Sequence, residues 1–215
     1  MSTQDPRIES VPSTGITGGA NCWIVGDDEE VIVIDPGTDA AAVLDAVGDR
    51  EVMAVICTHG HAGHCAAAME VAERDEAPVA LHPGDRQAWL EVHSDDPDID
   101  MEEGGKFEVG GVTLEVVHAP GHSRGSVCLL CDDLDAVFSG DVVAETGPVP
   151  HAGSFPNWGR QLDAIGAQIL TLPPQTRILP GHGDEFTVGT AEKRFDSWVA
   201  AGQDRPSAAD LGDVE

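Results

Sequence analysis

The chain has 215 residues, 39 of them acidic and 11 basic, so its formal net charge is −28. This charge argues against nucleic acids and anionic membranes as partners, because both are bound through clustered Lys and Arg. A hydrophobic content of 41% is too high for a disordered chain, and no apolar run approaches the ~20 residues that a membrane span requires.

The N-terminal half of the sequence predicts strands that alternate with helices. Residues 21–25 and 31–35 predict a hairpin, and a helix capped by Thr38 is expected through about Val47. The nearly continuous apolar run at 52–57 predicts a strand buried on both faces. The remaining elements of this half are a helix from about His64 to Arg74, a strand at 79–81, a helix over 83–93 and an acidic surface loop over 94–105.

The C-terminal half predicts a second set of strands and two further helices. Gly110-Gly111 marks a hairpin, and a helix over 158–172 places apolar residues on one face. The predicted strands are 107–109, 112–117, 126–131, 136–139 and 177–179, with a long loop over 142–157 and a closing helix over 195–201. Hairpins mixed with βα units indicate an α/β sandwich in which helices cover mixed sheets. We expect one domain over 1–204 and an acidic tail over 205–215.

Composition and the N-terminal residues also predict the cellular compartment of the protein. The first ten residues, MSTQDPRIES, have neither the basic nor the apolar region of a secretory signal. Five cysteines, an odd number, suit free thiols in a reducing cytosol, so we expect a cytoplasmic protein. Only Lys106 and Lys193 are lysines; such an acidic, Lys-poor chain fits adaptation to high salt, or a host whose proteins favour Ala, Asp and Arg.

The nine histidines are concentrated where predicted strands end. Four segments each place a His or Asp just past the carboxyl end of a strand and beside a Gly. Ligands and metals bind at that edge of α/β sheets, and glycine allows a close approach of the backbone. Imidazole and carboxylate suit Zn²⁺, Fe and Mn²⁺. The sequence therefore predicts a metal site made by His59, His61, His64, His122, Asp141 and His182.

Within this set, the spacing suggests two sub-sites. His59 and His61 can reach one ion from an extended loop, whereas His64 starts the following helix and can reach a second ion. Cys128 and Cys131 have the spacing of a zinc knuckle but lack a second pair. They fall on a predicted strand, where positions i and i+3 face opposite ways, so we interpret them as core residues.

Four motifs resemble those of the metallo-β-lactamase superfamily, and within it the glyoxalase II-like hydrolases. They are THGHAGH at 58–64, HAPGHSRGS at 118–126, FSGD at 138–141 and LPGHG at 179–183, with NCWIVGDDEEVIVIDPG at 21–37 matching the first strands. The resemblance covers about residues 14–200. It implies an αββα sandwich of two mixed sheets flanked by helices, with the metal site at the strand-end edge.

The resemblance also implies a role for each site residue. His59, His61 and His122 would hold the first metal, and His64 and His182 the second. Asp141 would bridge the two ions. Asp141 and His182 are the residues expected to take part in catalysis as well as in metal binding.

Residue 63 departs from the family pattern. The family usually reads His-x-His-x-Asp-His with the Asp on the second metal, and this chain has Gly63 there. Cys65 lies two positions further on and would point about 200° away on a helix, so we do not expect it to replace the carboxylate. Three arrangements follow: a binuclear site with a weak second ion, a mononuclear site, or a disabled enzyme. A glycine introduced by engineering is another explanation of the departure.

The function implied by the resemblance is hydrolysis of a small thioester by a metal-activated water, with activity weakened by Gly63. The cofactor would be zinc, as one or two ions per chain, or iron. A thiolate with a pKa of roughly 8.5 leaves readily and needs little acid assistance, which agrees with a site of only His and Asp. Glyoxalase II resembles this core followed by a helical extension that binds glutathione. Only 33 residues follow His182, so we expect a different thiol carrier or a broader small-molecule substrate.

The sequence is also compatible with other functions. The related persulfide dioxygenases resemble the same scaffold and use mononuclear iron on two His and one Asp, here His59, His122 and Asp141. Gly63 leaves this triad untouched. A metal-binding relative without turnover is a third hypothesis. The missing signal disfavours a true β-lactamase, the charge disfavours a nuclease, and the oligomeric state is left open.

Overall fold

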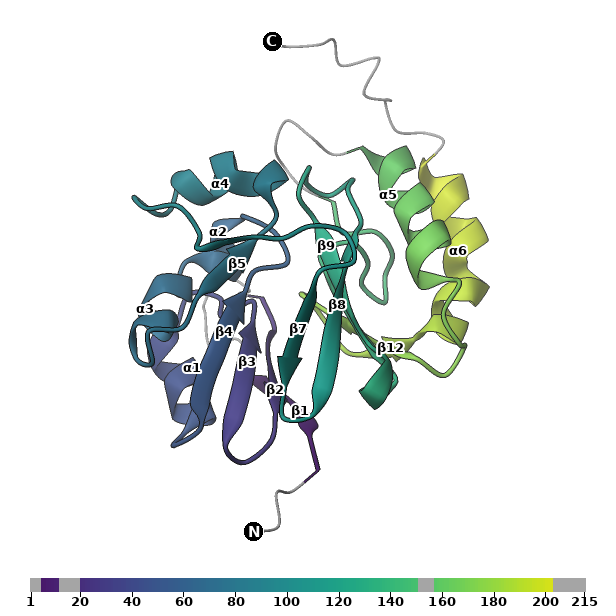
Figure 1. Cartoon of the computed structure of the whole chain (residues 1–215). Helices are drawn as coiled ribbons and strands as arrows, with labels where there is room; N and C mark the ends of the chain where they lie inside the picture. The colour runs from purple at the N-terminus through teal and green to yellow at the C-terminus, as the bar shows by residue number, and fades with distance from the viewer. Residues whose placement is uncertain (1–4, 12–19, 151–156, 203–215) are drawn as a thin grey trace.

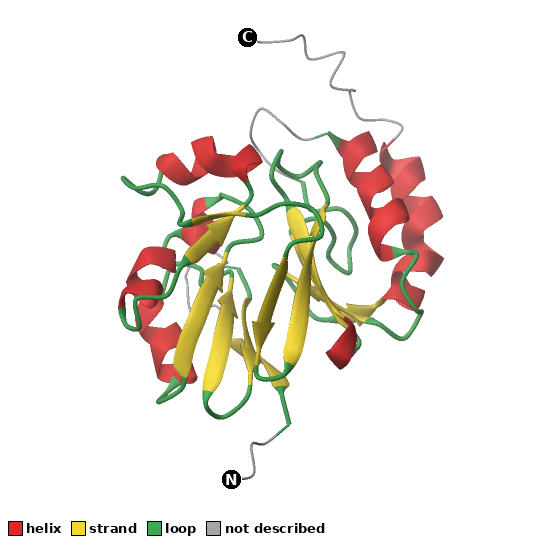
Figure 2. Ribbon diagram, in the orientation of Figure 1, coloured by secondary structure: helices red, strands yellow, loops and turns green. Residues whose placement is uncertain are grey.

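Two six-stranded mixed sheets pack face to face in the computed structural model, which describes residues 5–11, 20–150 and 157–202 (Figures 1 and 2). The first sheet has the order β1-β2-β3-β4-β5-β6. Its strands are β1 Arg7–Val11, β2 Cys22–Gly26, β3 Glu30–Ile34, β4 Glu51–Ile56, β5 Val79–Leu81 and β6 Ile99–Asp100. The second sheet has the order β12-β11-β10-β9-β8-β7. Its strands are β7 Lys106–Val109, β8 Val112–His118, β9 Val127–Cys131, β10 Ala136–Gly140, β11 Arg177–Pro180 and β12 Phe186–Thr187.

Helices cover the outer face of each sheet, as Figure 1 shows. On the first sheet lie α1 Ala40–Val47, α2 Ala62–Cys65, α3 Ala68–Glu73, the 3-10 turn η1 Pro83–Asp85 and α4 Arg86–Leu90. On the second lie α5 Trp158–Ala164, its π-helical continuation η3 Ile165–Ile169 and α6 Val188–Gly202, and the turn η2 Asp132–Leu134 joins β9 to β10. The αββα sandwich expected from the sequence is therefore confirmed.

Alternation along the strands divides the core into three clusters. In β3, Val31 and Val33 face the helices of the first sheet, while Ile32 and Ile34 face the second sheet. The third cluster lies between the second sheet and helices α5 and α6. Cys128 belongs to this third cluster and Cys131 to the cluster between the sheets. The two thiols thus face opposite sides of β9, as predicted for core cysteines.

Strand directions bring several loops to one end of the sandwich. β3, β4 and β5 are parallel neighbours in the first sheet. In the second sheet β8 and β10 are both antiparallel to β9, and β11 is parallel to β10. The carboxyl ends of these parallel strands therefore meet at one edge of each sheet, and the loops after β4, β8, β10 and β11 carry the predicted ligands.

Some element boundaries differ from the predictions. Asp39, not Thr38, caps α1 through a bond from the Ala42 amide to its carboxylate. The helix expected from His64 to Arg74 is two short helices, α2 and α3, and the one expected over 83–93 is η1 followed by α4. β4 is buried on both faces only in its last three residues, since Glu51 and Met53 are exposed.

Three short strands, β1, β6 and β12, were not predicted, and α6 begins at Val188 rather than near 195. The expected tail over 205–215 lies outside the described residues, as does part of the long loop over 142–157. Among the helices of the described ranges, none has the length and apolar character needed to cross a membrane.

Candidate metal centre

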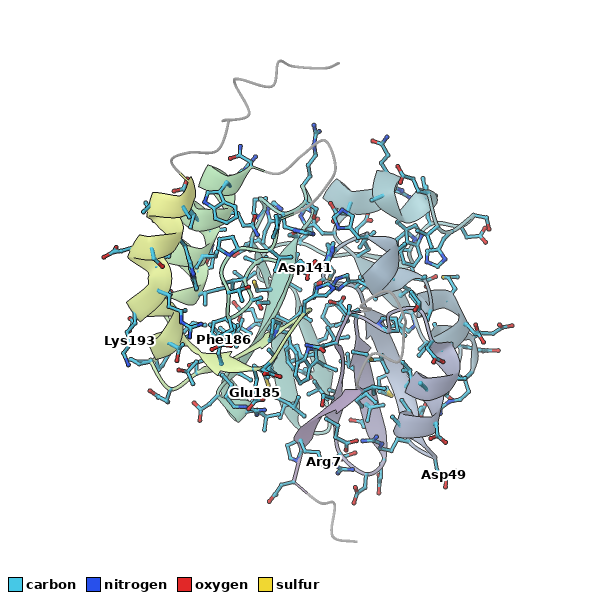
Figure 3. All side chains as sticks on the ribbon, turned by 180° about the vertical axis from the view of Figure 1, so that it is seen from behind. Arg7, Asp49, Asp141, Glu185, Phe186 and Lys193 are labelled. Atoms are coloured by element: carbon cyan, nitrogen blue, oxygen red, sulfur yellow. The ribbon has the colours of Figure 1, made fainter. Side chains whose placement is uncertain are left out.

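The six residues predicted as ligands come together at the strand-end edge. His59, His61 and His64 follow β4, whereas His122, Asp141 and His182 follow β8, β10 and β11 respectively. Figure 3 shows Asp141 between the two sheets, at the end of the sandwich away from Arg7 and Asp49. Each sheet therefore contributes three of the six side chains.

The first group of possible ligands is His59, His61 and His122, whose ligand atoms lie within 4.8 Å of one another. His61 Nδ1 lies 3.1 Å from His122 Nε2. His59 Nε2 and His122 Nε2 lie 4.0 and 3.5 Å from Asp141 Oδ2. Three imidazoles that meet beside a carboxylate in this way are a donor set suited to zinc or iron.

The second group is His64, Asp141 and His182. His64 Nε2 lies 3.4 Å from Asp141 Oδ2, and His182 Nδ1 lies 2.7 Å from Asp141 Oδ1. The two oxygens of Asp141 thus face different histidines, and Oδ2 also lies near His59 and His122 of the first group. This is the position expected of a bridging carboxylate.

Two buried nitrogen atoms indicate that the centre binds a cation. His59 Nε2 and His64 Nε2 are inaccessible to solvent and have no hydrogen-bond partner. A buried polar atom without a partner costs about 1–3 kcal/mol. Both atoms point to the same region as Asp141 Oδ2, so metal ions bound on the two sides of this oxygen would satisfy both. The residues present therefore fit a divalent metal.

The Nδ1 atoms of three histidines in the centre each lie beside an oxygen atom that holds the ring in place. Thr58 Oγ1 lies 3.1 Å from His59 Nδ1, and the Val149 carbonyl lies 2.9 Å from His122 Nδ1. Asp35 Oδ2 lies 2.9 Å from His64 Nδ1. Such contacts fix the ring orientation and direct the other nitrogen towards the metal centre.

Asp35 contributes to the centre through its backbone conformation and through its side-chain hydrogen bonds. It follows β3 with φ +51°, a left-handed conformation that Asp adopts more readily than most residues. Its carboxylate accepts hydrogen bonds from the Thr58 amide and from Thr58 Oγ1, both at 2.7 Å. Asp35 thus orients His64 and fixes the start of the loop that carries His59.

Burial and neighbouring charges shift the pKa values of the predicted ligands in different directions. Burial lowers the pKa of His59 well below its ordinary value, and His64 lowers it further. Burial alone would also lower the pKa of His64, but Asp35 and Asp141 outweigh it and raise the pKa to about 10. For Asp141, burial raises the pKa, but the hydrogen bond with His182 and the neighbouring His64 outweigh it, and the pKa lies well below the ordinary value. The metal-free centre therefore holds a carboxylate, a neutral His59 and a protonated His64 near pH 7.

Sequence reasoning missed Asp85, a buried carboxylate beside the first group. Asp85 ends η1, just after β5, and is 4% exposed. Its oxygens accept from the Gly60 amide at 3.0 Å, from Ser123 Oγ at 2.5 Å and from the Gly125 amide at 2.7 Å. The sequence signal was available, since His82-Pro83-Gly84-Asp85 also follows a strand and places a Gly beside an Asp.

Gln161 of α5 is a second residue that the sequence analysis did not identify. Its Nε2 donates to the carbonyls of Asp141 and Val142, at 3.1 and 2.8 Å. The side chain is 1% exposed. Helix α5 thereby holds the loop that carries the shared carboxylate.

Gly63 lies in α2, next to His64, and a Cβ atom at this position would meet nothing within 4 Å. Cys65 Sγ donates to the Gly60 carbonyl at 3.4 Å, and burial raises the pKa of its thiol to about 12. Cys65 belongs to none of the possible ligand groups in the described ranges. It therefore does not take the place of the missing carboxylate.

Comparison with known proteins identifies the class that this fold and site define. Residues 15–182 match the family model of the metallo-beta-lactamase superfamily, and the chain belongs to that family. The superfamily assignment made from the sequence is thus confirmed, and its members include metal-dependent hydrolases.

Particular relatives cover most of the chain. It is 31% identical to a probable metallo-hydrolase, YqgX, of Bacillus subtilis, over 80% of this chain and 89% of that protein. It is 28% identical to the hydroxyacylglutathione hydrolase GloC of Haemophilus influenzae, over 90% of this chain and 98% of that protein. The crystal structure of TTHA1623 in a di-iron-bound form superposes with a TM-score of 0.71 at 28% identity, covering 85% of this chain and 96% of the other.

Proposed function

We propose that this protein is a metal-dependent hydrolase that cleaves a small thioester. The observation that carries the proposal is the convergence of both ligand groups on Asp141, with two buried Nε2 atoms that have no other partner. The similarity to GloC, a hydroxyacylglutathione hydrolase, supports a thioester substrate. The donor set of His and Asp agrees with this chemistry, because a thiolate leaving group needs little acid assistance.

Each side chain has a defined part in the proposed reaction. His59, His61 and His122 would hold one ion and His64 and His182 the other, with Asp141 shared. A divalent metal bound there supplies Lewis-acid chemistry, because it lowers the pKa of water towards about 7 and polarises a carbonyl oxygen.

The surrounding residues keep these donors ready for the ion. Asp35 holds His64 by its Nδ1 atom. The Val149 carbonyl does the same for His122. The near-complete burial of His59 and His64 keeps solvent off the inner side of the centre. The donor atoms are thus oriented before metal and substrate arrive.

Mononuclear-iron persulfide dioxygenation is the second candidate. One observation favours it: His59 Nε2 and His122 Nε2 both face Asp141 Oδ2, which makes a two-His, one-carboxylate set of the kind that non-haem iron oxygenases use. The di-iron form of TTHA1623 shows that a relative of this fold holds iron. His61 separates the two proposals, because only the hydrolase requires it.

Metal content and turnover of the purified protein test the proposal. Elemental mass spectrometry gives ions per chain, and release of free thiol from an acyl-glutathione measures hydrolysis, with a chromogenic β-lactam as control substrate. Thioester turnover that needs metal and is lost in His61→Ala supports the hydrolase. Oxygen uptake on glutathione persulfide that survives in His61→Ala supports the dioxygenase. Bound metal without turnover on any of these substrates would identify a catalytically impaired relative.

A further inference from the structure

We infer that Asp85 is a positioning residue for the proposed metal centre. Its carboxylate joins the loop of His59 and His61 to the loop of His122. The inference rests on the proposed metal-binding function. Asp85 is not itself a ligand, since it belongs to none of the possible ligand groups among the described residues. It acts through the residues that flank the ligands in the chain.

Each partner of the Asp85 carboxylate lies next to a predicted ligand or close to it. Oδ2 accepts from the amide of Gly60, the residue between His59 and His61. The same oxygen accepts from Ser123 Oγ, directly after His122. Oδ1 accepts from the Gly125 amide at the end of the same turn. One buried carboxylate thus sets the separation of two loops that come from different sheets.

Three glycines allow these loops to approach so closely. A Cβ at Gly60 would lie 2.7 Å from the Asp85 carbonyl oxygen, and one at Gly125 would lie 2.6 Å from the Asp85 amide nitrogen. A Cβ at Gly84 would lie 2.9 Å from the Gly125 amide nitrogen. All three distances are too short for a side chain. The backbone is therefore packed around Asp85 more tightly than any other residue type would permit.

The chemistry at position 85 requires a carboxylate. Its two oxygens face three donors and no acceptor, and an ionised carboxylate has only acceptors. Asparagine would turn one of these oxygens into an amino group that faces a donor. In Asp85→Asn the Gly60 amide or the Gly125 amide therefore loses its acceptor, although the size of the side chain is unchanged.

A matched control is available in the β2–β3 hairpin. Asp27 is also buried, and its Oδ1 accepts from the amides of Glu29 and Glu30 at 2.8 and 2.9 Å. It tethers a turn that carries no predicted ligand. Asp27→Asn thus makes the same chemical change as Asp85→Asn without touching the centre.

The experiment compares the full-length wild type with Asp85→Asn, Asp27→Asn and Ser123→Ala. Titration of the metal-free proteins with Co²⁺, in competition with a chelator, gives the affinity and the visible spectrum of the first site. Amide hydrogen exchange of the metal-free proteins reports on the Gly60 and Gly125 amides. We expect Asp85→Asn to lose about 10- to 100-fold in Co²⁺ affinity, with an altered spectrum and faster exchange at the Gly60 amide or the Gly125 amide, whichever loses its acceptor. Ser123→Ala should show a smaller loss, since both amide bonds to Asp85 remain.

The outcomes separate this inference from the proposed function. If the wild type binds Co²⁺ but Asp85→Asn matches it in affinity and spectrum, the role of Asp85 is overturned and the metal centre stands. If the wild type binds no Co²⁺, the metal centre itself is overturned, and the inference with it. Should Asp85→Asn fail to fold, Ser123→Ala decides, and unchanged affinity and spectrum in that variant would overturn the inference. An equal loss in Asp27→Asn would also overturn it.

Discussion

A methyl group added at Gly181 should weaken the second ligand group most. A Cβ atom at this position would lie 2.5 Å from His64 Cε1 and 2.7 Å from Asp141 Oδ1. The first distance is about 0.9 Å shorter than an ordinary contact of 3.4 Å. Neither side chain can move away freely, because His64 is held by Asp35 at 2.9 Å and Asp141 by His182 at 2.7 Å. Gly181→Ala therefore displaces His64, Asp141 or both.

The size of the effect follows from that displacement. Disturbing the support of a metal ligand costs about 10- to 100-fold in affinity, which corresponds to about 1.4–2.7 kcal/mol of binding free energy. Titration of metal-free protein with Zn²⁺ against a chromogenic chelator measures both sites. We expect the wild type to bind two ions and Gly181→Ala to retain only the ion held by His59, His61 and His122.

Gly63→Ala provides the control for this prediction. It also adds one methyl group beside His64, but into open space. Its Zn²⁺ binding should match that of the wild type. The reasoning is refuted if Gly181→Ala binds the second ion as tightly as the wild type, or if Gly63→Ala loses that ion to the same extent.

Three further predictions follow from the site and the composition. Gly63→Asp should tighten binding of the second ion by about tenfold or more, because a side chain fits there and adds a negative charge; unchanged affinity in the same titration would contradict this. In metal-free protein, Asp35 and Asp141 outweigh burial and raise the pKa of His64 to about 10, so this ring is protonated at pH 7 and must lose its proton to bind metal. Calorimetry in buffers of different ionisation enthalpy should then show release of about one proton per second-site ion. The affinity for this ion should rise about tenfold per pH unit from pH 7 to 9. Binding of the second ion without proton release would disprove the assignment of His64 as its ligand. If the charge of −28 reflects salt adaptation, the melting temperature should rise steeply with molar KCl, and a flat response excludes it.

The main elements of the fold were predictable because their signals are local. The β2–β3 hairpin is marked by two apolar runs around a turn, and the burial of both faces of β3 follows from its position between two layers. The ligand positions were predictable for the same reason, since each His or Asp follows a strand and lies beside a Gly. Parallel strand directions then bring these local signals to one edge.

Features that depend on distant partners were not predictable. β1 is only partly buried and becomes a strand by pairing with β2, and β12 is two residues long and pairs with β11. Asp85 follows a strand and lies beside a Gly, as the predicted ligands do, but this context does not show which groups it contacts. Its burial and its three donors come from loops 25 and about 40 residues away in the chain, and no local pattern reveals such contacts.

The division of the six ligands between the two sheets makes the metal a cross-link between the halves of the chain. Residues up to β6 supply His59, His61 and His64, and residues from β7 onward supply the other three. An ion bound by both halves is released when they separate, so it stabilises their association by RT ln(1 + [L]/Kd), which is about 2.7 kcal/mol at 100 times Kd. Loss of bound metal during denaturation would thus report directly on the separation of the two sheets, and neither half expressed alone would hold a complete ligand group around Asp141.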